Sequence, residues 1–125
     1  MADYTASRID ELPELWDGFA RLVRKGLGIT SFGANVMDVP GDYTTGAHDE
    51  SESGQEELYV ALRGSAWVLV GPADDSETAL ELDADHMVRV GAGERRRLRA
   101  SAEGCRVLIV GGTPGQAYAP AEWSS

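Results

Sequence analysis

From Ile29 onward the sequence is a series of short segments in which apolar and polar residues alternate, with turn residues between the segments. This period of two is typical of half-buried β-strands. Strands are therefore predicted near residues 30–39, 57–63, 66–71, 78–83, 87–91, 95–100 and 105–111. Several short strands at such spacing, with almost no helix among them, indicate an all-β fold, either an antiparallel sandwich or a barrel.

Glycine, proline and polar residues between these segments predict the turns. Gly64 and Ser65 are expected to form a two-residue hairpin between the segments LYVALR and AWVLVG. Longer turns are predicted at PADDS (72–76), DADH (83–86) and SAEG (101–104).

The first 29 residues follow a different pattern. Apolar residues recur there at helical spacing, at Leu12, Leu15, Trp16, Phe19, Leu22 and Val23. Asp10 is a candidate cap for this helix, Pro13 would lie in its first turn, and the segment GLG (26–28) could end it. The sequence thus predicts a helical segment over residues 1–29, a β-barrel over 30–112, and a Gly-, Pro- and Ala-rich tail over 113–125 on the surface.

Length and charge narrow the classes of partner. A chain of 125 residues can bury the core of one domain and is too short for two. Its net charge of −10 argues against nucleic acid or an anionic membrane as a partner, because both require a basic surface. The single cysteine allows no disulfide within the chain, and MADYTASRIDELPELW lacks the features of a signal peptide. We therefore expect a cytoplasmic protein.

The stretch GAHDESESGQEELYVALRG, residues 46–64, carries the main candidate site. It is an acidic loop with one histidine that leads directly into a predicted strand. If Glu57 faces the inside of the barrel, Tyr59 and Ala61 do so too, because side chains alternate along a strand. A carboxylate and a phenol would then share the wall of a cavity, where barrels often hold ligands.

Residues 48–64 also resemble the first signature motif of the cupin superfamily. Six residues separate Glu57 from Gly64, as in that motif, and His48 resembles its first histidine. Glu50 stands in the place of the second histidine, and its gap to Glu57 is two residues longer than in the cupin pattern.

The stretch LDADHMVRVGAGERRRLRA resembles the second cupin motif, although with two departures. Gly93 matches a glycine of the motif, Gly91 stands in the place of its proline, and Arg96 occupies its histidine position. The resemblance covers roughly residues 30–112, and the wider sequence is similar to small single-domain bacterial cupins. It implies a cupin-type double-stranded β-helix, which is a jelly-roll barrel, here with a short N-terminal helix.

The cupin resemblance implies a metal site of three imidazoles and one carboxylate, and the departures change its chemistry. An arginine is always protonated and only donates hydrogen bonds, so Arg96 cannot be a ligand. Its charge would disfavour a neighbouring dication by an energy on the order of several kcal/mol. We therefore predict a metal-independent site in which Glu57 forms a bidentate pair with Arg96.

Two alternatives to this pair remain open. Arg96 could instead point to solvent with Arg95 and Arg97, although strand alternation places it on the opposite face from both. A divalent transition metal could also bind to the remaining donors, His48, Glu50 and Glu57.

Three functions are compatible with these residues. The first is a metal-independent cupin that binds a small molecule, which could be anionic, through His48, Glu50, Glu57, Tyr59 and Arg96. The second is an enzyme, either a metal-dependent oxygenase or a metal-free isomerase with His48 or Glu57 as general base. Because Arg96 should lower the pKa of Glu57, Glu57 is the weaker candidate for a base. The third is a homodimeric interaction module whose cavity is filled by Trp67, Tyr59 and Leu98.

Other conspicuous residues have simpler expected roles. His86 should be solvated in its turn, and Cys105 should be a buried apolar residue. Trp16, Phe19 and Trp123 are expected to pack the helix and the tail.

Overall fold

The structure is a computed structural model that describes residues 2–73 and 76–125. Its strands are β1 (Glu14–Leu15), β2 (Ala20–Leu22), β3 (Gly33–Val39), β4 (Glu56–Val70), β5 (Thr78–Leu82), β6 (Met87–Val90) and β7 (Arg96–Gly112). The helices are α1 (Val23–Leu27) and two short 3-10 helices, Ile9–Glu11 and Glu122–Ser124. The predicted all-β jelly-roll fold with a short N-terminal helix is confirmed.

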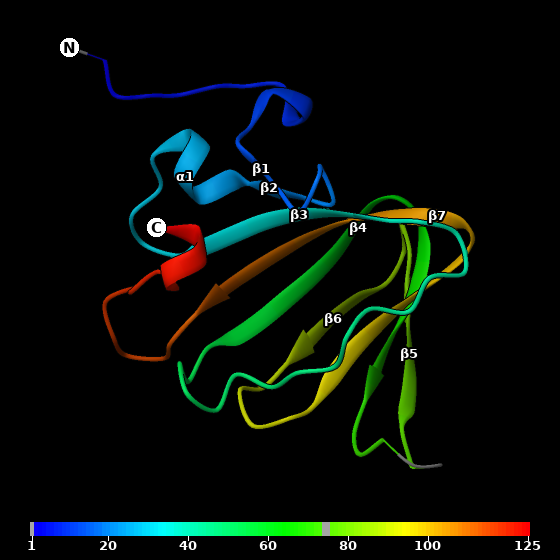
Figure 1. Cartoon of the computed structure of the whole chain (residues 1–125). Coiled ribbons are helices and arrows are strands. Elements are labelled where there is room, and N and C mark those ends of the chain that lie inside the picture. Colours follow the sequence, from blue (N-terminus) through cyan, green and yellow to red (C-terminus); the bar gives the residue numbers. More distant parts are fainter. Residues whose placement is uncertain (1, 74–75) are drawn as a thin grey trace.

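Two long strands organise the sheet. The strand order is β1-β2-β3-β7-β4-β5, and β6 also pairs with β4. All of these pairs are antiparallel; the first part of β4 lies beside β6 and the second part beside β5. β4 and β7 therefore run side by side through most of the molecule (Figure 1). The core lies on their inner face and includes Tyr59, Val68, Leu82, Leu98 and Val107.

The predicted hairpin at Gly64-Ser65 and the predicted turn at SAEG (101–104) are both wrong. β4 continues through the first position and β7 through the second, and Gly64 pairs with Cys105. Glycines allow these strands to bend, since φ is +73° at Gly64 and +82° at Gly104. A Cβ atom on Gly64 would lie 2.1 Å from the Gly104 carbonyl oxygen. The glycines thus mark a bend where the backbones of two paired strands approach closely, which is another use of glycine in β-structure.

The position predicted for the N-terminal helix, along the apolar residues from Leu12 to Val23, is wrong as well. Residues 14–22 form the hairpin β1–β2, whose turn contains Asp17 and Gly18 with φ of +60° and +86°. An Asp-Gly pair is a strong hairpin signal because both central residues of the turn need positive φ. Here it overrides the helical spacing, since Ala20 and Leu22 are buried as strand residues beside β3. The helix α1 has only five residues and ends, as predicted, at a left-handed Gly28.

The remaining expectations concern the turns, the cysteine and the tail. Asp83 and His86 form a bridge that closes the predicted turn DADH (83–86). Within PADDS (72–76), Asp74 and Asp75 lie outside the described residues. Cys105 is buried as predicted, and burial raises the pKa of its thiol to about 11.

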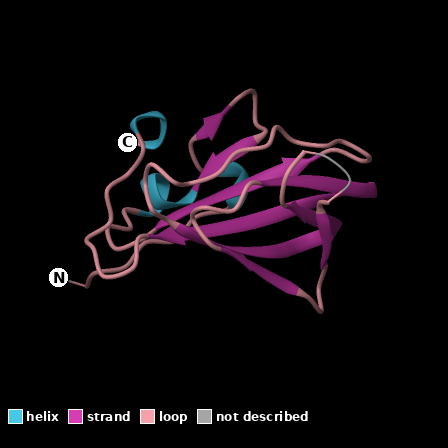
Figure 2. Ribbon diagram, turned by 90° about the horizontal axis from the view of Figure 1, so that it is seen from below, coloured by secondary structure: helices cyan, strands magenta, loops and turns pink. Residues whose placement is uncertain are grey.

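The short helices lie toward one end of the sheet (Figure 2). Among the described residues, no helix has the length and apolar character needed to span a membrane. The tail folds back beside α1, because Arg24 donates a hydrogen bond to the Ser124 carbonyl oxygen.

Candidate functional site

A cavity of about 410 Å³ lies on the inner face of β3, β4 and β7. It is lined by all five residues predicted as ligand-binding, which are His48, Glu50, Glu57, Tyr59 and Arg96. The volume lies within the usual range for small-molecule sites. The cavity remains open beside Tyr59 and Leu98, while Trp67 is 38% exposed and is not among its lining residues. A purely structural module was expected to have a filled cavity, whereas this cavity is open.

Arg96 is buried in the cavity wall, with 1% of its side chain exposed. Its Nη1 donates to the Glu94 carbonyl oxygen at 2.9 Å, and its Nη2 donates to the Gly91 carbonyl oxygen at 3.2 Å. Arg97 points the opposite way and binds the Glu77 carboxylate at 2.6 Å. The predicted alternation is thus confirmed, and the alternative in which Arg96 points to solvent is wrong.

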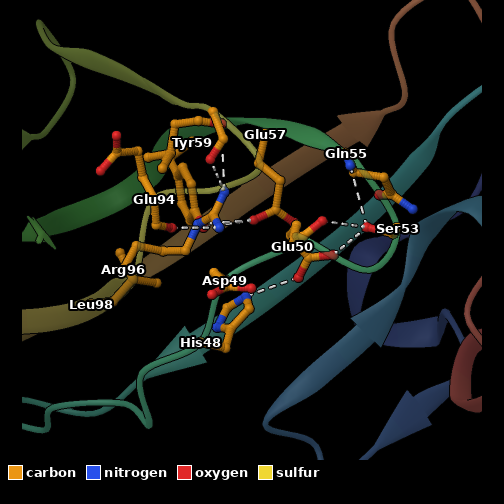
Figure 3. Close-up of polar contacts among 12 residues, drawn as sticks. His48, Asp49, Glu50, Ser53, Gln55, Glu57, Tyr59, Glu94, Arg96 and Leu98 are labelled. Carbon is orange, nitrogen blue, oxygen red and sulfur yellow. Dashed lines mark hydrogen bonds and ion pairs between the residues drawn. The ribbon is translucent and has the colours of Figure 1, made fainter. Parts of the chain in front are cut away.

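The contact between Arg96 and Glu57 differs from the predicted bidentate pair. Arg96 Nε lies 3.7 Å from Glu57 Oε1, because both Nη atoms are turned toward the loop carbonyls (Figure 3). Nε makes no hydrogen bond to any described residue. The same Glu57 oxygen accepts a hydrogen bond of 2.8 Å from the Tyr59 hydroxyl. Glu57 therefore gains one hydrogen bond and one looser ionic contact.

Burial raises the pKa of Glu57 above its ordinary value, and the negative charge of Glu50 adds to this effect. The Tyr59 hydrogen bond and the Arg96 charge act in the opposite direction but do not outweigh burial. Arg96 thus acts in the expected direction, but the net pKa of Glu57 is raised and not lowered. The desolvation of Glu57 dominates because the guanidinium approaches it at one atom only, at 3.7 Å. Burial also raises the pKa of Tyr59, which keeps its hydroxyl protonated as a donor.

His48 and Glu50 reach the cavity from the loop before β4. The backbone of His48 exchanges two hydrogen bonds with that of Arg96, at 3.0 and 2.8 Å, so the loop is fixed against the start of β7. His48 Nε2 lies 3.1 Å from Glu50 Oε2, and Glu50 also accepts a hydrogen bond from the Ser53 hydroxyl (Figure 3). The His48 side chain is 51% exposed. The loop thus places one imidazole and one carboxylate at the solvent side of the cavity.

Three of these residues could in principle act as metal ligands. One donor atom each from His48, Glu50 and Glu57 lie within 4.8 Å of one another. Three donors of this kind can coordinate a divalent transition ion. The guanidinium of Arg96, however, lies beside one of them, and the Tyr59 hydroxyl already uses a Glu57 oxygen.

A second cluster of donors, Glu81, Asp83 and His86, lies at the turn between β5 and β6. His86 is 51% exposed, in agreement with its predicted solvated role. Its Nδ1 lies 2.8 Å from Asp83 and its Nε2 lies 3.2 Å from Glu81. These two carboxylates account for both ring nitrogens.

The sequence reading missed an aromatic part of the cavity wall. Trp16 from the β1–β2 turn and Tyr118 and Trp123 from the tail all line the cavity. Trp16 and Trp123 pack against each other, as expected for packing residues, but not on a helix. The Asp17-Gly18 turn was the available signal, because a hairpin there places Trp16 beside the barrel. No pattern in the tail indicates that it turns back onto the cavity.

No family model and no curated protein matches this chain. Among solved structures, it is similar to a cupin protein from Bacteroides fragilis, with a TM-score of 0.69 and 15% identity over 97% of this chain and 93% of the other. It is also similar to oxalate decarboxylase from Bacillus subtilis, with a TM-score of 0.62 and 18% identity over 78% of this chain. This second match covers 26% of the length of the oxalate decarboxylase chain. At these identities the likeness concerns the fold alone.

Proposed function

Since this chain has the cupin fold, as its signature motifs indicated, we propose that it binds a small carboxylic acid inside the barrel without a metal ion. The observation that carries this proposal is Arg96, a buried cation in the wall of a cavity of about 410 Å³. Its Nε lacks a hydrogen-bond acceptor among the described residues. A ligand carboxylate oxygen would supply that acceptor.

A charge-assisted hydrogen bond to a guanidinium is about twice as strong as a neutral one, and more so in a desolvated site. The two Nη atoms already donate to loop carbonyls, so the guanidinium is held in one orientation before a ligand binds. The Tyr59 hydroxyl already donates to Glu57, so its oxygen is left to accept a hydrogen bond from a ligand.

Arg96 also argues against a resident metal ion. A dication coordinated by Glu57 would lie close to a guanidinium whose Nε is 3.7 Å from the same carboxylate oxygen. The repulsion in a partly desolvated site would be on the order of several kcal/mol. The positive charge of Arg96 thus partly neutralises the Glu57 carboxylate, as a metal cation would.

The experiment is a calorimetric titration of chelator-treated protein with acetate and oxalate, and with glucose as an uncharged control. We expect binding of at least one carboxylate and none of glucose. Arg96→Lys should weaken the binding by roughly tenfold or more, because it keeps a cation but removes Nε as a donor. Arg99→Lys is the matched control, because Arg99 is an exposed arginine of the same strand outside the cavity lining, and it should leave the affinity unchanged. Carboxylate binding that survives Arg96→Lys unaltered would contradict the proposal.

A metal-dependent cupin enzyme is the second candidate, and the closeness of His48, Glu50 and Glu57 favours it. Bound to these donors, a divalent ion would supply Lewis-acid chemistry. Elemental analysis of the purified protein separates the two candidates. Manganese, iron or zinc at one ion per chain, lost in His48→Ala, would favour the enzyme and contradict the metal-independent site.

A further inference from the structure

The cavity has an aromatic wall, formed by Trp16, Tyr118 and Trp123, that the proposed contacts of the acid group do not use. The Trp16 and Trp123 rings lie with their centroids 5.5 Å apart and are tilted by 36°. They nevertheless remain 54% and 50% exposed. Because both indoles line the cavity with much of their surface free, a flat apolar group in the cavity could bury area on both rings.

The β1–β2 hairpin holds Trp16 in this position. Trp16 has a φ of +54°, which is uncommon for a bulky residue, and Asp17 follows with +60°. The Phe19 amide donates to the Trp16 carbonyl oxygen at 3.1 Å and closes the turn. The ring of Trp16 is therefore presented by a tight turn and not by a loose terminal segment.

The tail is anchored at two further points. Arg24 of α1 donates a hydrogen bond to the Ser124 carbonyl oxygen, and its guanidinium lies 5.9 Å from the centre of the Tyr118 ring. Tyr118 packs closely on Gly33, where a Cβ atom would lie 2.5 Å from the tyrosine hydroxyl oxygen. These contacts hold the C-terminal 3-10 helix beside α1 (Figure 1). The aromatic wall is thus fixed in place before a ligand binds, which lowers the entropy lost on binding.

From this arrangement, and resting on the proposed acid binding, we propose that the aromatic wall is a ring-binding subsite and that the ligand is a small aromatic carboxylic acid. Its carboxylate contacts Arg96, and its ring packs against Trp16 and Trp123. A single-ring acid is small enough for a cavity of about 410 Å³. A carboxylic acid without a ring would make only the contact between its carboxylate and Arg96.

The test compares three probes on the full chain by calorimetry: acetate, benzoate and uncharged benzamide. We expect benzoate to bind roughly tenfold or more tightly than acetate, because burial of its ring adds apolar area. Trp123→Ala should reduce the affinity for benzoate to about that for acetate and leave acetate unchanged, whereas Trp123→Phe should retain part of the gain. Trp67→Ala, which removes an exposed indole outside the cavity lining, is the matched control and should change neither affinity.

Fluorescence gives an independent readout. The sequence contains three tryptophans, so in Trp67→Phe all indole emission comes from Trp16 and Trp123. Benzoate should change this emission and acetate should not.

The outcomes distinguish the subsite from the proposed function. Equal affinities for benzoate and acetate would overturn the ring subsite and leave the acid-binding function intact. Binding of benzamide that Trp123→Ala abolishes, with no binding of either carboxylate, would support the ring subsite and overturn the acid. If no probe binds, both proposals are wrong.

Discussion

Arg96 is the residue on which the proposed chemistry of the cavity depends. Its charge meets the Glu57 carboxylate at 3.7 Å and two loop carbonyls at 2.9 and 3.2 Å. That Arg96 faces inward could be predicted from strand alternation and from its place in the motif. The sequence could not predict which Arg96 nitrogen lies nearest Glu57. That geometry depends on the positions of the Gly91 and Glu94 carbonyls, which are set by the fold of the loop before β7.

Replacing Arg96 should strongly destabilise the fold. Arg96→Leu leaves Glu57 buried without a cation and removes the guanidinium donors of the Glu94 and Gly91 carbonyls, which should reduce the free energy of unfolding by about 3–5 kcal/mol. Arg97→Ala is the matched control and should cost much less, because Glu77 keeps its ion pair with Arg95 when Arg97 is removed. Urea unfolding of both variants measures the difference. Equal losses would mean that burial of Arg96 is of no special energetic consequence.

Glu57 should make stability depend on pH in a defined direction. Its pKa in the folded state is raised, so the native protein binds a proton there more readily than the unfolded chain does. The resulting stabilisation is present below the unfolded-state pKa and is lost as the pH rises through the folded-state pKa. Compared with Glu57→Gln, the wild type should therefore become progressively less stable as the pH rises through that window. Urea unfolding at a series of pH values measures this, and a difference that does not vary with pH would refute it.

At the scale of elements, the long strands β4 and β7 form the frame of the cavity. Period-two alternation predicts most of their residues correctly, but the glycines at 64 and 104 indicate turns that the structure does not contain. Local sequence cannot separate a hairpin from a bend within a strand, because both need positive φ at glycine. The difference arises from the partner strand, because β4 and β7 pair on both sides of the bend, at Gly64 with Cys105 and at Ala66 with Ala100, across a register shift.

The bend predicts that Gly64 cannot be replaced. Gly64→Ala places a methyl group 2.1 Å from the Gly104 carbonyl oxygen at a φ of +73°, so β4 or β7 must shift. We expect a loss of at least about 2 kcal/mol in the free energy of unfolding. Gly93→Ala is the control, since no heavy atom lies within 4 Å of the added Cβ there, and it should stay within about 1 kcal/mol. Urea denaturation compares them; a tolerated Gly64→Ala would show that the two strands are not in tight contact at the bend.

At the scale of the whole molecule, the two ends of the chain join the barrel. β1 and β2 extend the sheet beside β3, and the tail supplies part of the cavity wall. The sequence division into a helical segment (1–29), a barrel (30–112) and a surface tail (113–125) therefore describes the composition better than the packing. Contacts between residues about 100 positions apart, such as Arg24 with Ser124, leave no local pattern that could predict them.

The outer face of the sheet bears on the expected homodimer. Leu58, Leu62 and Met87 are 37%, 44% and 68% exposed there, on strands β4 and β6. We expect two copies to pair over this face, because pairing would bury these side chains. Light scattering should give twice the mass of one chain, and Met87→Glu should shift it toward the monomer. Tyr4→Glu, an exposed position in the N-terminal segment, should not. A monomeric wild-type protein would contradict the expectation.

The central claim is that a buried arginine, and not a metal ion, balances the acidic cavity. The most direct measurement is anomalous diffraction at the manganese, iron and zinc absorption edges from crystals of protein purified without chelators. We predict no anomalous peak among His48, Glu50 and Glu57, with the Arg96 guanidinium in the cavity wall near Glu57. A peak coordinated by these residues, or an Arg96 side chain turned into solvent, would contradict the claim.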